Sequence, residues 1–188
     1  MRPEHVAARP ECPDPGRWLA PDGHATETDV TALIAAFVTA LKPEFVVETG
    51  TYLGDTTVAI GEALKAQGRG QLLSIDNDPV MTQHTALRVH DLPVTLITSN
   101  ASDVIPPHPI DLMFIDASLE SRMAQVRAFY PYASRRCVIL LHDSAIIMDA
   151  DGAQAMYADM ALAVTTGLVQ PWLKLPTPRG LAITRYVA

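Results

Sequence analysis

The chain has 188 residues, the size of a single domain that can bury a hydrophobic core. Its composition, 48% hydrophobic and 19% charged, is ordinary for a soluble α/β protein, and a net charge of −7 gives no electrostatic support for a nucleic-acid substrate. We expect a protein of the reducing cytoplasm, because the two cysteines form no CxxC motif, no apolar run is long enough to cross a bilayer, and there is no signal-peptide pattern.

Residues 1–25 contain five prolines and no periodic apolar pattern, which predicts an extended N-terminal arm. Its large apolar pair, Trp18 and Leu19, could pack on the domain itself or cover a substrate or a partner subunit. Residues 26–188 are expected to form one domain. That domain should begin with a helix, because Thr26 and Asp29 have the spacing of a capping box and apolar residues then recur at helical intervals up to Pro43.

From residue 45 onward, short β-rich runs alternate with helical patterns. Strands are predicted over 45–48, 71–76, 94–98, 111–115 and 137–142, and helices over 55–67, 79–90 and 119–133. This alternation is typical of βαβ units, with a parallel sheet covered by helices on both faces. Two further β-rich runs, 169–175 and 181–187, are joined by a Pro- and Gly-containing turn, which predicts a terminal hairpin.

The most informative motif is the run Glu48-Thr49-Gly50-Thr51-Tyr52-Leu53-Gly54, which follows an apolar strand and precedes a helix. Its glycines permit a sharp turn and a close approach of the backbone to a ligand, although the spacing is not GxGxxG. Asp76 ends the next strand, where a carboxylate can hold a ribose diol. In the same segment Asp78, followed by Pro79, could cap the next helix.

With the segments 112–117 and 138–143, these residues resemble the class I S-adenosylmethionine (SAM)-dependent methyltransferases from about Thr28 to the C-terminus. Within that class the chain is most similar to small O-methyltransferase-like proteins whose fifth strand ends in His-Asp. The resemblance implies a Rossmann-like, doubly wound, mostly parallel seven-stranded sheet with a C-terminal antiparallel hairpin. It also implies SAM as cofactor, with contacts from Glu48, Thr49, Gly50, Thr51, Tyr52, Gly54, Thr56, Asp76, Asn77, Asn100, Ala101, Ser102 and Asp116.

Three of these contacts can be given more specific roles. Glu48 would orient the methionine part of SAM or, alternatively, only tie the glycine turn together. Asn100 would hold the adenine, since an amide can both donate and accept hydrogen bonds. Asp116 would lie by the ammonium or the sulfonium.

His142 and Asp143 are the expected catalytic residues. Methyl transfer from SAM is a direct displacement, and a hydroxyl acceptor must lose its proton. A histidine beside a carboxylate suits a general base, with Asp143 as its orienting partner; the alternative is a hydrogen-bonded structural histidine.

Some O-methyltransferases of this class hold a divalent cation at the ends of strands four and five. Asp116 and Asp143 match two such ligands, so Mg²⁺ is a possible second cofactor. The pattern departs from the family at Ser144, where catechol-type members carry Asn, and at Leu119, where His-Asp-type members often carry an acidic-His pair.

The sequence therefore predicts a SAM-dependent methyltransferase acting on a hydroxyl of a small-molecule acceptor. The alternatives are an NAD-dependent oxidoreductase and a SAM-binding domain that has lost or redirected methyl transfer. Because no cap domain is inserted, residues 144–167 and the arm are the only material for a lid, and a homodimer could complete the pocket.

Overall fold

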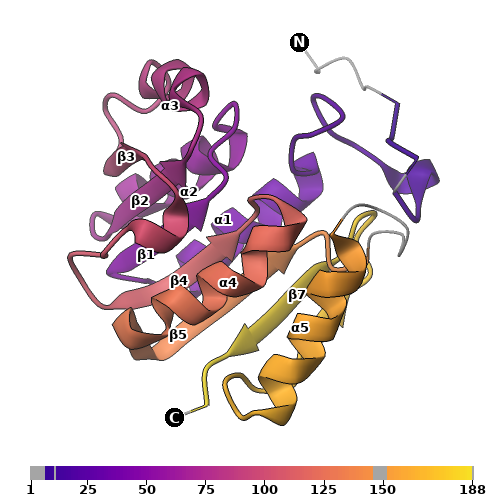
Figure 1. Ribbon diagram of the computed structural model, residues 1–188. Helices are drawn as coiled ribbons and strands as arrows, with labels where there is room; N and C mark the ends of the chain where they lie inside the picture. The colour runs from indigo at the N-terminus through magenta and orange to yellow at the C-terminus, as the bar shows by residue number, and fades with distance from the viewer. Residues whose placement is uncertain (1–6, 11, 146–151, 188) are drawn as a thin grey trace.

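A computed structural model describes residues 7–10, 12–145 and 152–187 (Figure 1). One seven-stranded sheet has the strand order β3-β2-β1-β4-β5-β7-β6. The first five strands in this order are parallel, β7 is antiparallel to β5, and β6 is antiparallel to β7. The strands are β1 Phe45–Thr49, β2 Gln71–Asp76, β3 Val94–Thr98, β4 Ile110–Ile115, β5 Ala133–His142, β6 Leu173–Leu175 and β7 Leu181–Arg185. The predicted fold class, including the terminal hairpin, is confirmed.

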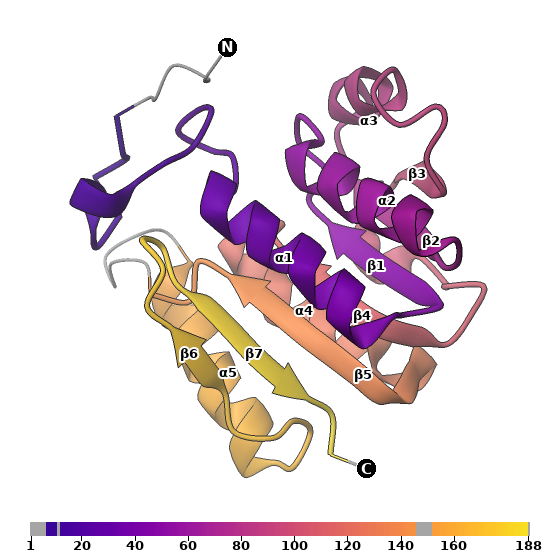
Figure 2. The same cartoon turned by 180° about the vertical axis from the view of Figure 1, so that it is seen from behind.

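Helices cover both faces of the sheet. The helices are α1 Thr28–Leu41, α2 Asp55–Gln67, α3 Pro79–Ala86, α4 Leu119–Phe129 and α5 Ala153–Thr165. Helices α4 and α5 lie on one face and α1 and α2 on the other, as Figures 1 and 2 show from opposite sides. None of the helices in the described residues combines the length and the apolar composition that crossing a bilayer requires.

Strand alternation divides the buried side chains between two cores. Val47, Ile115 and Ile139 point toward α4 and α5, whereas Val46 and Leu112 point toward α1 and α2. Because successive side chains of a strand face opposite sides, a parallel strand covered on both sides must be apolar at almost every position. Strand β4 is buried along its whole length.

Several predicted boundaries were wrong. The helix expected over 79–90 ends at Ala86, and the helix expected over 119–133 ends at Phe129, where a 3₁₀ turn containing Pro131 follows. Proline lacks the N–H that an α-helix would need there. Strand β5 begins earlier than predicted, at Ala133, and β6 is shorter, although an isolated bridge between Val169 and Tyr186 extends the pairing.

The start of α1 also differs from the prediction. Glu27 rather than Thr26 is the N-cap residue, and its side chain makes no capping hydrogen bond. The hydroxyl of Thr26 instead donates to Asp116 Oδ2 at 2.8 Å. The expected capping box between Thr26 and Asp29 is therefore not formed, and Thr26 and Glu27 instead face the charged groups described below.

The N-terminal segment packs on the domain's own hairpin turn, one of the alternatives left open by the sequence. Arg17 Nη2 donates to the carbonyl of Pro176 at 3.1 Å, and Cys12 Sγ lies 3.4 Å from the carbonyl oxygen of Pro178. Trp18 is buried, and the guanidinium of Arg179 lies 5.7 Å from the centre of its ring. The N-terminal segment is therefore held against the turn between β6 and β7.

Candidate active site

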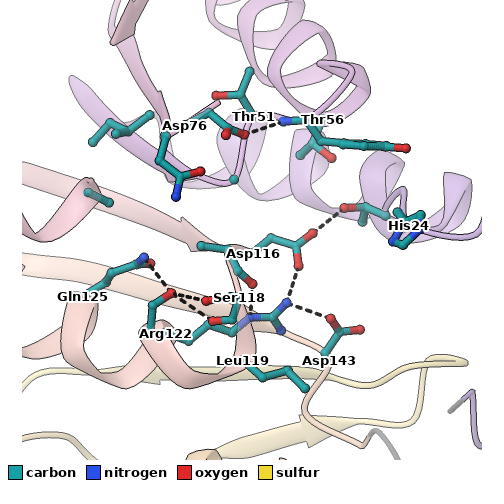
Figure 3. A pocket seen from close by; sticks show the side chains of 18 of the residues that line it. His24, Thr51, Thr56, Asp76, Asp116, Ser118, Leu119, Arg122, Gln125 and Asp143 are labelled. Carbon is teal, nitrogen blue, oxygen red and sulfur yellow. Dashed lines mark hydrogen bonds and ion pairs between the residues drawn. The ribbon is translucent and has the colours of Figure 1, made fainter. Parts of the chain in front are cut away.

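A cavity of about 780 Å³ opens beyond the carboxyl ends of the parallel strands, where β1 and β4 lie side by side (Figure 3). The chain leaves β1 toward β2 on one side, and β4 leads to β5 on the other, so the strand order reverses between them. Ligands of open α/β sheets bind at such a switch point. The cavity is therefore where a cofactor is expected.

The glycine turn forms one wall of the cavity. Gly50 has φ +84° and Gly54 has φ +83°, both in the left-handed region. A Cβ atom at Gly50 would overlap the carbonyl group of Asp116, and one at Gly54 would overlap the side chain of Thr85. The turn can thus lie against the end of β4 and against α3 only because these two positions lack a side chain.

Asp76 fastens this turn to the tip of β2. Its Oδ2 accepts a hydrogen bond from the backbone N–H of Tyr52 at 2.9 Å, and its Oδ1 accepts from the N–H of Asp78 at 2.9 Å. Each carboxylate oxygen can accept a further bond, and Asp76 lines the cavity. Asp78 caps α3 by accepting from Val80 N, with Pro79 at the first turn, as predicted.

The cavity brings together most of the predicted cofactor contacts. Its walls include Gly50, Thr51, Tyr52, Gly54, Thr56, Asp76, Asn77, Asn100, Ala101 and Asp116, together with Asp143. The four predicted site residues that do not line it are Glu48, Thr49, Ser102 and His142.

Glu48 and Thr49 are buried behind the turn. Oε2 of Glu48 accepts from the hydroxyls of Thr57 and Ser74, each at 2.6 Å, while Oε1 has no partner among the described residues. Burial raises the pKa of the Glu48 carboxyl to about 7, against the lowering effect of the two hydroxyls. Thr49 donates to Gln125 Oε1 of α4 at 2.7 Å. The geometry thus favours the structural alternative that the sequence left open for Glu48, because its carboxylate links β1 to α2 and β2 rather than facing the cavity.

His142 is fully buried at the end of β5. Its Nδ1 lies 3.0 Å from Asp116 Oδ1, and its Nε2 lies 2.6 Å from Glu27 Oε2. Burial alone would lower the pKa of this imidazole, but the charges of Asp116 and Asp143 and the hydrogen bonds raise it to about 10. An imidazolium that donates from both nitrogens has no lone pair for an acceptor's proton. The role of general base stays a prediction, and this arrangement gives it no support.

The expected metal ligands lie close to each other but are already paired with cations. Potential ligand atoms of Asp116, His142 and Asp143 all lie within 4.8 Å of one another. Arg122 Nη2, however, lies 2.9 Å from Asp116 Oδ1 and 2.7 Å from Asp143 Oδ2, between the two carboxylates (Figure 3). Arg179 Nε lies 2.5 Å from the other oxygen of Asp143. In this conformation these side chains do not fit a Mg²⁺ ion, which requires free oxygen ligands.

Charge pairing also controls the protonation of Asp143. Burial would raise the pKa of its carboxyl, but the charges of His142, Arg122 and Arg179 hold that pKa well below its usual range. The pKa of Glu27 is likewise lowered, because its pairing with His142 outweighs its burial. Both carboxylates are therefore weak proton acceptors at neutral pH.

Sequence reasoning missed the residues that make this cluster possible. Glu27 was read as part of a helix start, and Arg122 and Arg179 lie in a helix and a turn where charged residues are common. No spacing in the chain links the three. The N-terminal segment also lines the cavity, with Arg9, Cys12, His24, Ala25 and Thr26.

The lid expected from residues 144–167 is only partly described, since residues 146–151 lie outside the described residues. Within α5, Met156 and Met160 are buried in the core against the sheet. This helix is therefore a structural layer of the domain.

Comparison with known proteins agrees with this geometry. A family model described as a methyltransferase domain matches residues 47–144, more than half of the chain. No curated protein sequence matches significantly.

Solved structures share the fold at low sequence identity. The methyltransferase PaMTH1 of Podospora anserina, bound to S-adenosylhomocysteine (SAH), has a TM-score of 0.74 at 16% identity over 93% of this chain and 82% of its own. The O-methyltransferase TomG of Streptomyces achromogenes, in complex with SAM, has a TM-score of 0.74 at 15% identity over 88% and 83%. An O-methyltransferase of Bacillus cereus in complex with SAH has a TM-score of 0.72 at 16% identity over 89% and 84%. With the family model covering the glycine turn and the ends of β2, β4 and β5, the chain belongs to the methyltransferase domain family and has the class I methyltransferase fold.

Proposed function

We propose that the protein transfers the methyl group of SAM to an oxygen atom of a small-molecule acceptor by direct displacement. The observation that carries this proposal is the cavity at the switch point, lined by the carboxylate of Asp76 and by a turn whose Gly50 and Gly54 have no room for a side chain. Glycines in such a turn let the backbone approach a ligand closely, and a carboxylate at the second strand tip suits a ribose diol.

The cavity residues divide between two ends of the bound cofactor. Asp76 and Asn77 at the end of β2 would hold the ribose, and Asn100 and Ala101 after β3 would border the adenine. Asp116, which faces the glycine turn, would lie at the methionine end. When bound, SAM supplies an electrophilic methyl group on a sulfonium, so the residues must chiefly hold the acceptor oxygen in line with it.

Arg179 is our choice for the contact with the acceptor. It lines the cavity, and its Nη1 is buried without a hydrogen-bond partner among the described residues. Since a buried N–H without a partner is costly, this atom is available to donate to the acceptor oxygen. His142 would then act as a positioning residue that joins α1 to the end of β4 through its two hydrogen bonds.

Calorimetric titration with SAM, SAH and NAD is the first test. We expect micromolar binding of SAM and SAH, and no binding of NAD. Asp76→Asn should weaken SAH binding by roughly ten- to a hundredfold, the value of one or two hydrogen bonds to a charged group. The matched control is Asp78→Asn, which changes a neighbouring carboxylate that only caps α3 and should leave the affinity unchanged.

The outcome of that titration separates the alternatives. Binding of NAD with no binding of SAM or SAH would favour the oxidoreductase and contradict the proposal. If SAM binds, a panel of phenols, catechols, carboxylic acids and amines, followed by SAH release, should show turnover only on oxygen acceptors. Tight SAM binding with no turnover on any acceptor would favour a domain that has lost methyl transfer. A homodimer that completes the pocket is part of the same proposal, and a strict monomer by light scattering would remove it.

A further inference from the structure

We propose that the guanidinium of Arg122 occupies the place of a divalent cation, so that the acceptor end of this site works without a metal. The proposal rests on the proposed function for its consequence in catalysis, but the occupancy of the position can be tested separately. It concerns the two carboxylates, Asp116 and Asp143, that the sequence assigned to Mg²⁺.

Arg122 is fixed at this position by every nitrogen of its guanidinium. Nη2 bridges the two carboxylates at 2.9 and 2.7 Å, Nη1 donates to the carbonyl of His142, and Nε donates to the carbonyl of Ala117 at 2.8 Å. The residue is 3% exposed. Since the two carbonyls come from the ends of β5 and β4, the guanidinium is held by the same strand tips that would present a metal's ligands.

The charges at this position are already balanced. The guanidinium groups of Arg122 and Arg179 face Asp116 and Asp143. His142, whose pKa is raised, pairs with Asp116 and with the third carboxylate, Glu27. A Mg²⁺ ion placed between these carboxylates would need to displace Arg122 and leave a buried guanidinium without its anions, a costly arrangement. It would also find few oxygen ligands, because one oxygen of Asp116 accepts from Thr26 and Oδ2 of Asp143 accepts from both Arg122 and Arg179. Oδ1 of Asp143 accepts no hydrogen bond among the described residues, but Arg179 Nε lies 2.5 Å from it.

A fixed guanidinium can carry out part of the work of the metal it replaces. It would add positive charge to the acceptor end of the cavity, and it orients the neighbouring carboxylates. Unlike an ion, it provides no open coordination position for two hydroxyls of one acceptor. The transfer should therefore proceed without a divalent cation.

Titration with Mn²⁺, followed by the loss of its free electron paramagnetic resonance signal, tests the proposal on the whole protein. The wild-type protein should bind no Mn²⁺ up to about 1 mM, with or without SAH. Arg122→Met keeps a long side chain but removes the charge, and it should create a Mn²⁺ site at least tenfold tighter than any in the wild type. The matched control is Arg127→Met, which removes an exposed arginine of the same helix and should create no site.

Three results would overturn the proposal. One is wild-type binding of Mn²⁺ below about 100 µM that Asp143→Asn removes. Another is a folded Arg122→Met protein that takes up no more Mn²⁺ than the Arg127→Met control. If Arg122→Met fails to fold, the wild-type titration still decides. The third result, which requires that turnover has been established, is a loss of activity in EDTA that Mg²⁺ restores. A lack of SAH binding would instead refute the proposed function and leave the Mn²⁺ results valid.

Discussion

Replacement of Glu48 by glutamine should change how the stability of the protein depends on pH. Glu48 is fully buried between β1 and α2, and burial raises the pKa of its carboxyl from 4.5 to about 7. The folded protein therefore binds this proton more tightly than the unfolded chain does. Glu48 stabilises the fold fully below pH 4.5, and this stabilisation is lost as the pH rises through 7.

The size of the effect follows from the shift. One pKa unit corresponds to about 1.4 kcal/mol, and most of the shift is titrated between pH 5 and pH 8, so wild-type stability should fall by about 2.5 kcal/mol over this range because of Glu48. Glutamine stays neutral, and its amide oxygen can accept from Thr57 and Ser74 as the carboxyl does. The difference in unfolding free energy between the two proteins should therefore change by the same amount.

Urea denaturation of both proteins at pH 5, 6, 7 and 8 measures this difference, since other titrating groups are common to both. Glu44→Gln is the matched control, because Glu44 lies just before the same strand but is exposed and forms a surface ion pair with Arg69. Its stability should follow the wild-type curve. Parallel curves for the wild-type and Glu48→Gln proteins from pH 5 to pH 8 would refute the raised pKa of the Glu48 carboxyl.

Three other substitutions test the glycine turn, the hydrogen bond between Thr49 and α4, and the packing of Trp18 on Arg179. Gly50→Ala should destabilise the protein by about 2–4 kcal/mol and abolish SAH binding, because its φ is +84° and its Cβ has no space; a normal melting temperature with intact binding would contradict this. Thr49→Val should cost about 1–3 kcal/mol in urea denaturation, because it leaves Gln125 Oε1 buried without its donor, and an unchanged unfolding midpoint would argue against that bond. Trp18→Ala should lower the free energy of opening of residues 12–25 by about 3 kcal/mol through lost packing on Arg179, measured by amide hydrogen exchange; equal exchange rates in both proteins would count against this contact.

The fold could be predicted from the sequence because its signals are local. A strand covered on both faces must be apolar throughout, and a helix between two such strands must be amphipathic, so alternation alone defines the βαβ units. The ends of elements were less predictable. The helix over 119–133 was drawn too long because its pattern continues into a 3₁₀ turn, and only the local geometry at Pro131 separates the two.

The candidate site was predictable where a single segment carries the information. Gly50, Gly54 and Asp76 could be chosen because a turn and a strand tip have recognisable residue types. The arginines that pair with Asp116 and Asp143 could not be predicted in this way. Arg122 and Arg179 lie 57 positions apart by number, and they meet at Asp143 only because β7 returns beside β5.

The position of a polar residue relative to the end of its strand explains which predictions reached the cavity. Glu48, Thr49 and His142 lie within β1 and β5, so the pleat turns their side chains toward neighbouring layers, and each has buried hydrogen-bond partners there. Asp116 and Asp143 come one residue after their strands, where the backbone leaves the sheet, and both line the cavity. In β1 and β5 the polar side chains inside the strand therefore support the fold, whereas Asp76, the last residue of β2, and the first residues beyond β4 and β5 line the cavity. For this reason the His-Asp pair is better read as a division of roles, with His142 anchoring the layers and Asp143 facing the site.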